Sequence, residues 1–305
     1  LGMGKLGSKE MNFYSDLDLI LIYNSRAEYN HEGQANKSLP TYFARFTQAL
    51  VSAFVSLTEE GRLYEVDMRL RPSGKQGPVA TSLSSFHSYQ IEKAWVWEHM
   101  ALSRGRVISG GGVIKRQVQA VFKEVFDRRT HSIITIKKQT LRMRNSLREN
   151  FSSTFVPPEI KFGRGGMQEL ELLVQMGFLL TNLSYKPNQQ SPRQLIKRLC
   201  DVGFFSEDEG KNLLTTHILY FNYQQIYCIF NVKMSGDERL SDIGLFHLLS
   251  CIADQTIRAR IKSVDGLNKL LVERSDFIGN LFDSKLKLDT SIDEIKEISK
   301  YFGKK

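Results

Sequence analysis

Three aspartates are the residues of this sequence whose type and spacing best suit catalysis. Asp16 and Asp18 flank Leu17 at the start of the run DLDLILIY, and residues i and i+2 of a strand project from the same face. Two like charges side by side are costly unless a cation lies between them. Solvated aspartates at a strand edge are the alternative, and the apolar run after them, typical of a buried strand, argues against it. The pair therefore predicts a cation site.

Asp67 lies on a second predicted strand, residues 62–70, in which apolar and charged residues alternate so that the charges share one face. Together with Asp16 and Asp18, it would complete a site for two Mg²⁺ ions. Two such ions, ~3.5–4 Å apart, stabilise the attacking and leaving oxygens of a displacement at phosphorus. Carboxylate oxygens favour Mg²⁺ over Zn²⁺, and no His or Cys is near these aspartates in the sequence.

Several residues near the aspartates could bind a triphosphate. Gly7 and Ser8, in GKLGS, predict a turn whose backbone N–H groups face phosphate, although most Gly-Ser pairs are only turns. Lys5 is a looser candidate, because a solvated lysine is the more common case.

Arg69 and Arg71 follow Asp67 on the same strand face and could neutralise triphosphate charge. Salt bridges to Asp67 or Glu65 are the alternative, and for Arg71 we weigh the two equally. Lys75 is a weaker phosphate candidate, like Lys5. Three more residues have structural interpretations: Trp95 and Trp97 as packing residues, and His99 as a hydrogen-bonded structural histidine. For Arg104 and Arg106, a salt bridge and a phosphate contact are equally expected.

The elements expected to position these residues divide the chain into two parts, and the fold class we predict is α+β. Residues 1–112 combine predicted strands at 16–23, 62–70 and 106–108 with helices that begin after Ser38 and at 82 and 94. Residues 113–305 are predicted to be all-helical, with amphipathic segments at about 114–129, 131–151, 166–183, 191–201 and 206–232. We place the boundary in the glycine turn at residues 110–112.

Composition narrows the class of protein without deciding its function. The formal net charge of +9 suits a triphosphate, an acidic protein or nucleic acid, and a lysine-rich surface accounts for most of it. Cys200, Cys228 and Cys251 form no C-x-x-C pair, which argues against a zinc site or a disulfide framework. No apolar run approaches the ~20 residues of a membrane-spanning helix. We therefore expect a cytoplasmic protein with reduced thiols.

The motifs resemble a known family. A Gly-Ser pair, a D-x-D strand and a later strand aspartate resemble the DNA polymerase beta-like nucleotidyltransferases. Three longer stretches resemble glutamine synthetase adenylyltransferase: GMGKLGSKEMNFYSDLDLILIY, TEEGRLYEVDMRLRPSGKQGPVATS and SYQIEKAWVWEHMALSRGRVISG. That family is bifunctional, with two nucleotidyltransferase halves, each followed by a helical bundle. LYEVDMRLRPSG and KAWVWEH resemble the C-terminal half, which adds AMP to glutamine synthetase.

The resemblance implies a function and a set of ligands. It implies Asp16, Asp18 and Asp67 as ligands of two Mg²⁺ ions, and Gly7 and Ser8 at the triphosphate of the substrate ATP. It implies attack of a glutamine synthetase tyrosine on the ATP α-phosphorus, in the regulation of nitrogen assimilation, with the PII signal protein as an expected partner. Neither nucleic acid nor a membrane is an expected partner.

Other expectations concern the helical part, the ends of the chain and rival functions. EIKFGRGGMQELELLVQMGFLL resembles the family more loosely, with Glu169 and Glu171 in place of its aspartate and glutamate, and we expect Glu169 to be a helix N-terminal carboxylate.

Because the chain begins LGMGKLGS, we expect a fragment that lacks an upstream strand and helix and is less stable without them. Two rivals stay open: a nucleotidyltransferase acting on RNA ends, and a non-catalytic regulatory module that binds PII or glutamine.

Overall fold

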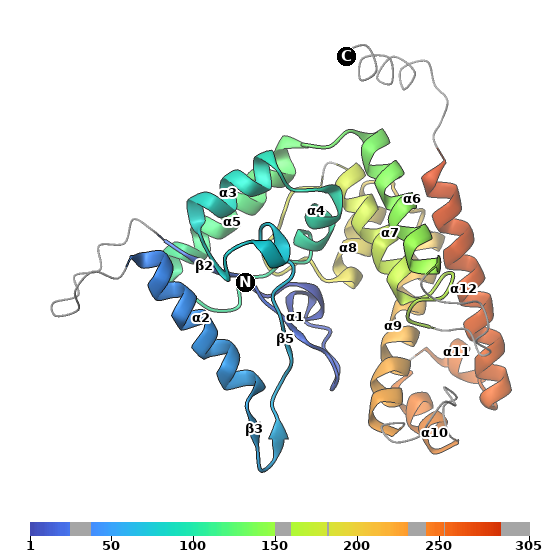
Figure 1. The fold of residues 1–305 in the computed structure, drawn as a ribbon. Helices are drawn as coiled ribbons and strands as arrows, with labels where there is room; N and C mark the ends of the chain where they lie inside the picture. The colour runs from blue at the N-terminus through green and yellow to red at the C-terminus, as the bar shows by residue number, and fades with distance from the viewer. Residues whose placement is uncertain (25–37, 150–159, 182, 231–241, 253, 288–305) are drawn as a thin grey trace, which may run out of the picture.

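The structure is a computed structural model, and it describes residues 1–24, 38–149, 160–181, 183–230, 242–252 and 254–287. All structural statements below concern these residues. The predicted loop at 25–37, the ends of three predicted helices (residues 150, 151, 182, 231 and 232) and the C-terminal stretch 288–305 lie outside them. Figure 1 shows the strands and helices of residues 1–128 on one side and the helices that follow them on the other.

The strands form three short two-stranded ladders. β1 (Leu17–Asp18) pairs in parallel with β5 (Val66–Asp67), and β2 (Leu21–Tyr23) pairs in parallel with β6 (Ala80–Ser82). The third ladder joins β3 (Leu57–Thr58) to β4 (Gly61–Arg62) in antiparallel fashion. The prediction of continuous strands over 16–23 and 62–70 was therefore wrong in extent. Each is divided, because its two parts pair with different partners.

The N-terminal helices agree with most of the predicted segments. They are α1 (Gly4–Ser8), α2 (Leu39–Val55), α3 (Leu83–Glu92) and α4 (Val96–Leu102). Ser82 caps α3, since its hydroxyl accepts a hydrogen bond from the Ser85 N–H at 3.1 Å. Two predictions differ from the structure. Gly7 and Ser8 end a short helix instead of forming an open turn, and the expected strand at 106–108 is a single bridge between Gly2 and Arg106.

Helix α5 (Gly112–Arg128) packs on the N-terminal part. Its residues Val118 and Phe122 share one apolar cluster with Met3, Ile20 and Phe86, and all five are almost fully buried. Burial of this kind contributes about 25 cal/mol per Å² of apolar surface. The apolar core of the N-terminal part, which includes Ile20 between β1 and β2, is thus completed by a helix that follows the glycine turn. The division of the chain at residue 112 stays a prediction.

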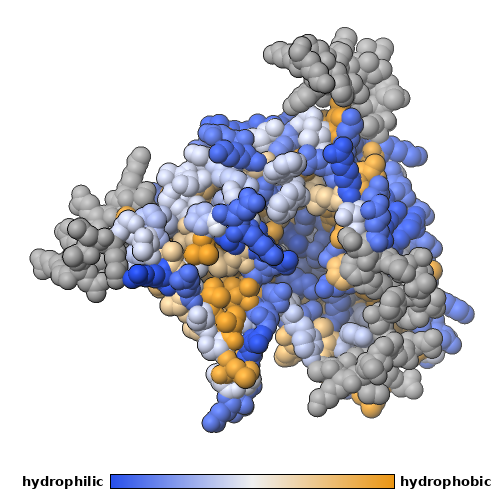
Figure 2. Space-filling model, viewed as in Figure 1, coloured by the Kyte–Doolittle hydropathy of each residue, from blue (hydrophilic) through white to orange (hydrophobic). Residues whose placement is uncertain are grey.

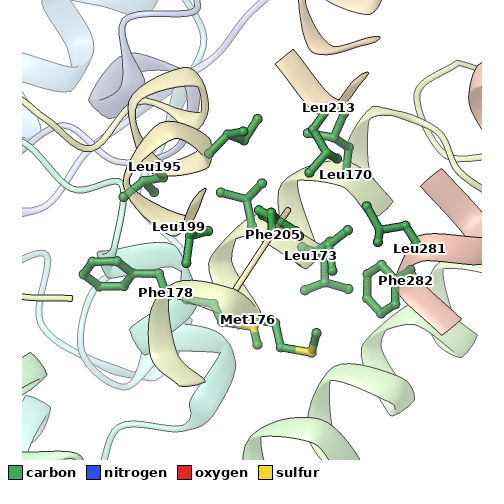
Figure 3. Packing of buried hydrophobic residues seen from close by; sticks show 14 of the residues in the cluster. Leu170, Leu173, Met176, Phe178, Leu195, Leu199, Phe205, Leu213, Leu281 and Phe282 are labelled. Carbon is green, nitrogen blue, oxygen red and sulfur yellow. The ribbon is translucent and has the colours of Figure 1, made fainter. Parts of the chain in front are cut away.

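The remaining described helices are α6 (Ile133–Glu149), α7 (Met167–Leu180), α8 (Pro192–Asp201), α9 (Glu207–Phe230), α10 (Asp242–Cys251), α11 (Gln255–Arg260) and α12 (Val264–Leu286). Helices α6, α8, α9 and α12 pack on α7, whereas α10 packs on α9 and α11 packs on α12. Figure 3 shows Leu170, Leu173 and Met176 of α7 at the centre of a cluster with side chains from α8, α9 and α12. Because α7 is buried on nearly all sides, its sequence is apolar apart from a few polar positions.

Glu169 is a charged residue inside this packing, with 1% of its surface exposed. It accepts a hydrogen bond from the Gly165 N–H at 3.0 Å, at the start of α7, which confirms the expected helix N-terminal carboxylate. It also pairs with the Nε atoms of Arg148 at 2.8 Å and Arg144 at 3.1 Å. Burial alone would raise the pKa of Glu169, but the two arginines and the Gly165 N–H hold it below its ordinary value.

Two further structural expectations have opposite outcomes. His99 is buried, its Nε2 lies 2.9 Å from the Gln90 carbonyl oxygen, and burial lowers its pKa to about 4, which confirms the structural interpretation. The prediction that Trp95 and Trp97 are packing residues was wrong for Trp95, which is 61% exposed, and Trp97 is 38% exposed. None of the helices in the described ranges is both long and apolar enough to cross a membrane.

Candidate active site

A cavity of about 600 Å³ lies where the strands of the N-terminal part face α9. Asp16, Asp18 and Asp67 line it from the strand side together with Lys5 and Arg69. The start of α7 and one face of α9 line it from the helical side. Figure 2 shows a hydrophilic hollow between the two parts of the molecule. A volume of ~300–1,000 Å³ is usual for a small-molecule site.

Asp18 and Asp67 are brought together by the β1–β5 ladder. They are Cα partners in the parallel register, and the flanking bonds Leu17 N–H to Glu65 O and Leu19 N–H to Asp67 O are both 2.8 Å long. Neighbouring strands lie about 4.8 Å apart, and register partners project from the same face. The two carboxylates therefore share one side of the ladder, and Asp16 lines the same cavity just before β1.

The surroundings of Asp18 oppose its ionisation. Burial raises its pKa to about 6, and the negative charges of Asp67 and Asp16 add to the rise. Arg104 and Arg69 act in the other direction without cancelling it. A carboxylate that is partly buried beside like charges gains stability from a nearby cation. Asp18 is thus the carboxylate of this cavity that most needs positive charge.

Asp67 has the opposite environment because Arg69 binds it directly. Nε and Nη2 of Arg69 donate to Oδ2 of Asp67 at 2.8 and 2.5 Å, and the Arg69 N–H donates to Oδ1 at 2.8 Å. These hydrogen bonds lower the pKa of Asp67. The salt bridge considered for Arg69 in the sequence is therefore what the structure shows, and a phosphate contact would require this arginine to move. Its side chain is 68% exposed, which leaves it room to do so.

The three aspartates fit a divalent cation in part. Asp18 and Asp67 provide two oxygen-bearing groups on one face, and burial, together with the neighbouring negative charges, raises the pKa of Asp18. Within the described ranges, however, no group of three or more His, Cys, Asp or Glu residues is arranged to hold a metal ion. Arg69 holds the Asp67 carboxylate with the positive charge that a cation would otherwise supply. Asp18 and Asp67 could thus hold Mg²⁺ once Arg69 releases Asp67.

The predicted phosphate-binding residues of α1 are divided between two cavities. Lys5 lines the cavity, and its Nζ donates to Oε1 of Gln224 on α9 at 3.2 Å. Gly7 and Ser8 line a second cavity, of about 300 Å³, and not the one that contains the aspartates. The Ser8 hydroxyl donates to the Gly4 carbonyl oxygen at 3.2 Å, and Arg106 Nε donates to the Gly7 carbonyl oxygen at 3.0 Å. The assignment of Gly7 and Ser8 to a triphosphate stays a prediction.

Arg71 supports the turn that follows β5. Its Nη1 donates to the Met68 carbonyl oxygen at 2.8 Å, and its Nε lies 3.1 Å from the Pro78 carbonyl oxygen. It therefore binds backbone carbonyls instead of Glu65 or Asp67. Neither Arg71 nor Lys75 is among the residues that line the large cavity.

Two residues of the cavity, Gly4 and Glu171, escaped the sequence reasoning as site residues, whereas Arg104 forms the salt bridge that was weighed against a phosphate contact. Gly4 has φ +48°, and a side chain there would collide with Oδ2 of Asp18. Arg104 Nη1 pairs with Oε2 of Glu171 on α7 at 2.8 Å, and both side chains are nearly buried. Gly4, the second glycine of GMGKLG, gave only a weak local signal that another group approaches the backbone closely there. The pairing of Arg104 with Glu171 has no local signal, because it joins elements far apart in the chain.

Comparison with known proteins agrees with this picture. Residues 1–123 match the family described as glutamate-ammonia ligase adenylyltransferase. Similar curated proteins are named bifunctional glutamine synthetase adenylyltransferase/adenylyl-removing enzyme. The chain is 40% identical to that of Bradyrhizobium diazoefficiens over 230 residues, which is 74% of this chain and 23% of the relative. It is 44% identical to that of Rhodopseudomonas palustris strain BisB5 over 248 residues, 79% of this chain and 25% of the relative.

These relatives are much longer than the chain, which spans about a quarter of their length. The family match covers β1, β5 and α1, and so includes all three aspartates and Lys5. The alignments with these relatives are longer than the family match and therefore extend into the helical part of the chain. The resemblance seen in the sequence is thus confirmed: residues 1–123 match the model of the glutamate-ammonia ligase adenylyltransferase family, and most of the chain is similar to one portion of the bifunctional enzymes.

Proposed function

We propose that this chain transfers AMP from ATP to a tyrosine of glutamine synthetase and releases pyrophosphate, as part of the regulation of nitrogen assimilation. The observation that carries the proposal is the pairing of Asp18 with Asp67 on one face of the β1–β5 ladder, inside a cavity large enough for a nucleotide. The printed names of the relatives support the choice of glutamine synthetase as acceptor.

In the proposed reaction the tyrosine hydroxyl oxygen forms a bond to the α-phosphorus of ATP. The bond from that phosphorus to the bridging oxygen of the β-phosphate breaks, and pyrophosphate leaves while the hydroxyl proton passes to solvent or to a carboxylate. Asp16, Asp18 and Asp67 would hold two Mg²⁺ ions, which supply charge stabilisation to both oxygens of the displacement. Lys5 and Arg104 add positive charge on the cavity wall, where transferred phosphoryl groups are stabilised.

Arg69 has two positions in this scheme. In the structure it neutralises Asp67, which keeps the carboxylate ionised without a metal. When Mg²⁺ and ATP bind, its exposed guanidinium turns to the triphosphate, whose oxygens it matches in geometry. We keep Gly7 and Ser8 as candidates for the same phosphates; α1 would have to rearrange for this, because the Gly7 N–H donates to the Met3 carbonyl oxygen at 2.7 Å and both residues line the second cavity.

We assign residues 1–112 to a polymerase beta-like nucleotidyltransferase domain and residues 113–305 to a helical bundle domain. The short parallel ladders and the long helices around α7 are compatible with this α+β division. We also propose a cytoplasmic location and the PII signal protein as a regulatory partner.

One experiment tests the function directly. The chain is incubated with ATP labelled in the α-phosphate, Mg²⁺ and unmodified glutamine synthetase, and the acceptor is analysed by mass spectrometry. Added AMP on a tyrosine supports the proposal, and labelled RNA ends in a parallel reaction would support the RNA rival. Removal of AMP from modified glutamine synthetase, without addition, would assign the chain to the opposite half-reaction. Binding of PII or glutamine without any transfer would support a regulatory module.

A further inference from the structure

We infer that Tyr223 and Tyr227 of α9 form the wall against which the base of the nucleotide lies, so that α9 in the helical part holds the base while the strands hold the phosphates. The inference rests on the proposed function, because it assumes that ATP enters the cavity with its phosphates at the aspartates. It concerns the opposite wall of the same cavity, to which no part of that reaction has yet been assigned.

The two tyrosines present parallel aromatic rings to the cavity. They are one helical turn apart on α9, with ring centroids 6.1 Å apart and an interplanar angle of 11°, and both line the cavity. Side chains at i and i+4 lie on the same helix face, which explains their common direction. Stacking of a base on an aromatic ring is tolerant of base identity and favourable for every base.

A hydrogen bond links this wall to the phosphate end of the cavity. Lys5 lines the cavity beside the aspartates, and its Nζ donates to Gln224, which lies between the two tyrosines in the sequence. An ATP molecule whose phosphates reach Lys5 and Asp18 therefore has its base directed towards α9. The Glu171–Arg104 pair closes the same end of the cavity from α7 and keeps that end polar.

Gln224 also offers a polar contact to the base. Its Oε1 is engaged by Lys5, whereas its Nε2 is buried and has no hydrogen-bond partner among the residues that the structure describes. A buried donor without a partner costs free energy, and a ring nitrogen of the base is a suitable acceptor. Aromatic contact and one directed amide are the usual ingredients of a nucleotide base site.

Two groups could contact this wall, the base of the nucleotide and the tyrosine of the protein acceptor, and the burial of the wall favours the base. Tyr223 is 7% exposed, so this wall is deep, whereas Tyr14, which lines the cavity near Asp16, is 58% exposed. A nucleotide base can reach the deep wall alone, but a tyrosine of a folded protein must enter from the exposed side. We therefore assign the α9 wall to the nucleotide.

The test measures binding of ATP and of inorganic tripolyphosphate to the chain, each with Mg²⁺, by calorimetry. Tyr227→Leu should raise the Kd for ATP about tenfold, which corresponds to about 1.4 kcal/mol, and leave the Kd for tripolyphosphate unchanged. Tyr227→Phe keeps the ring and should bind ATP like the wild type. Ile229→Ala, on the same helix but 49% exposed and not lining the cavity, is the matched control for changes in α9.

Each outcome decides the inference separately from the function. The inference that this wall contacts the base is refuted if Tyr227→Leu leaves the Kd for ATP unchanged, or if it raises the Kd for ATP and for tripolyphosphate equally. If Tyr227→Leu leaves the Kd for ATP unchanged but raises the KM for glutamine synthetase, the wall belongs to the acceptor. If the wild type shows the expected binding pattern but transfers no AMP to glutamine synthetase, the base wall stands and the proposed function fails. Absence of ATP binding by the wild type overturns both.

Discussion

The backbone of Gly4 lies directly against the carboxylate of Asp18. Gly4 has φ +48°, a conformation that side-chain-bearing residues rarely adopt, and a Cβ there would collide with Oδ2 of Asp18. The Met3 N–H donates to the Asp18 carbonyl oxygen at 2.9 Å, so the segment before α1 is fastened to β1. The position of this carboxylate thus depends on the absence of a side chain at residue 4.

We expect Gly4→Ala to lower AMP transfer at least tenfold and to reduce the free energy of unfolding by about 1–3 kcal/mol, because the new methyl group displaces Asp18 and the backbone is strained. Urea denaturation and the transfer assay measure the two effects. Gly111→Ala is the matched control, since a Cβ there meets nothing within 4 Å. Equal effects of the two substitutions would contradict a specific contact between Gly4 and Asp18.

Asp18→Asn and Asp67→Asn should each reduce AMP transfer by more than a hundredfold while the fold is retained. The amide keeps the size of the side chain but removes the charge that would hold Mg²⁺. Initial rates with labelled ATP measure the loss, and circular dichroism verifies the fold. Glu124→Gln, a half-exposed carboxylate that pairs with His87 away from the cavity, should transfer normally. Substantial activity in Asp18→Asn would refute the proposed metal-ligand role.

The raised pKa of Asp18 predicts a specific dependence of stability on pH. Because its pKa rises from 3.8 to about 6, the folded state holds the proton more tightly than the unfolded state. Its contribution is favourable at low pH and is lost as the pH rises through about 6. Asp18→Asn should therefore gain about 1–2 kcal/mol relative to the wild type between pH 5 and pH 7.5 in the absence of Mg²⁺, after discounting for solvent screening. Urea denaturation at both pH values gives the difference, and a constant difference would argue against the pKa shift.

Arg69 should compete with a divalent cation for Asp67. Removing the guanidinium in Arg69→Ala leaves the carboxylates without their counter-charge, and we expect Mn²⁺, as a probe of the site, to bind several-fold more tightly without nucleotide. Electron paramagnetic resonance of free Mn²⁺ measures the Kd. Arg62→Ala removes an arginine of β4 that pairs with Glu65 outside the cavity and should leave the Kd for Mn²⁺ unchanged. Weaker Mn²⁺ binding in Arg69→Ala would mean that Arg69 supports the cation site.

The buried network at the start of α7 should matter for stability far more than exposed ion pairs do. Glu169→Gln leaves Arg144 without its buried counter-charge and should cost about 3–5 kcal/mol of unfolding free energy. Glu273→Gln removes a comparable bond to Arg260, but both side chains are about half exposed, so about 0–1 kcal/mol is expected. Chemical denaturation of both variants provides the comparison. Similar losses would contradict the role assigned to burial.

The sequence by itself determined the local features of this protein. The periodicity of apolar residues predicted most of the long helices, and the acidic i, i+2 spacing at Asp16 and Asp18 placed both in one cavity. These features depend on neighbours within a few residues, which a single sequence displays. The resemblance of residues 1–123 to a family is likewise a property of consecutive residues. The roles of the aspartates as metal ligands remain predictions.

Only the tertiary structure decided which distant residues meet. It divided the two predicted strands, paired β1 with β5, and set α9 opposite the aspartates through Lys5 and Gln224. It also engaged Asp67 with Arg69 and placed Gly7 and Ser8 in a different cavity. Each of these contacts depends on how the helices pack around the strands. That packing is a sum of many weak, non-local interactions, and no pattern of neighbouring residues encodes it.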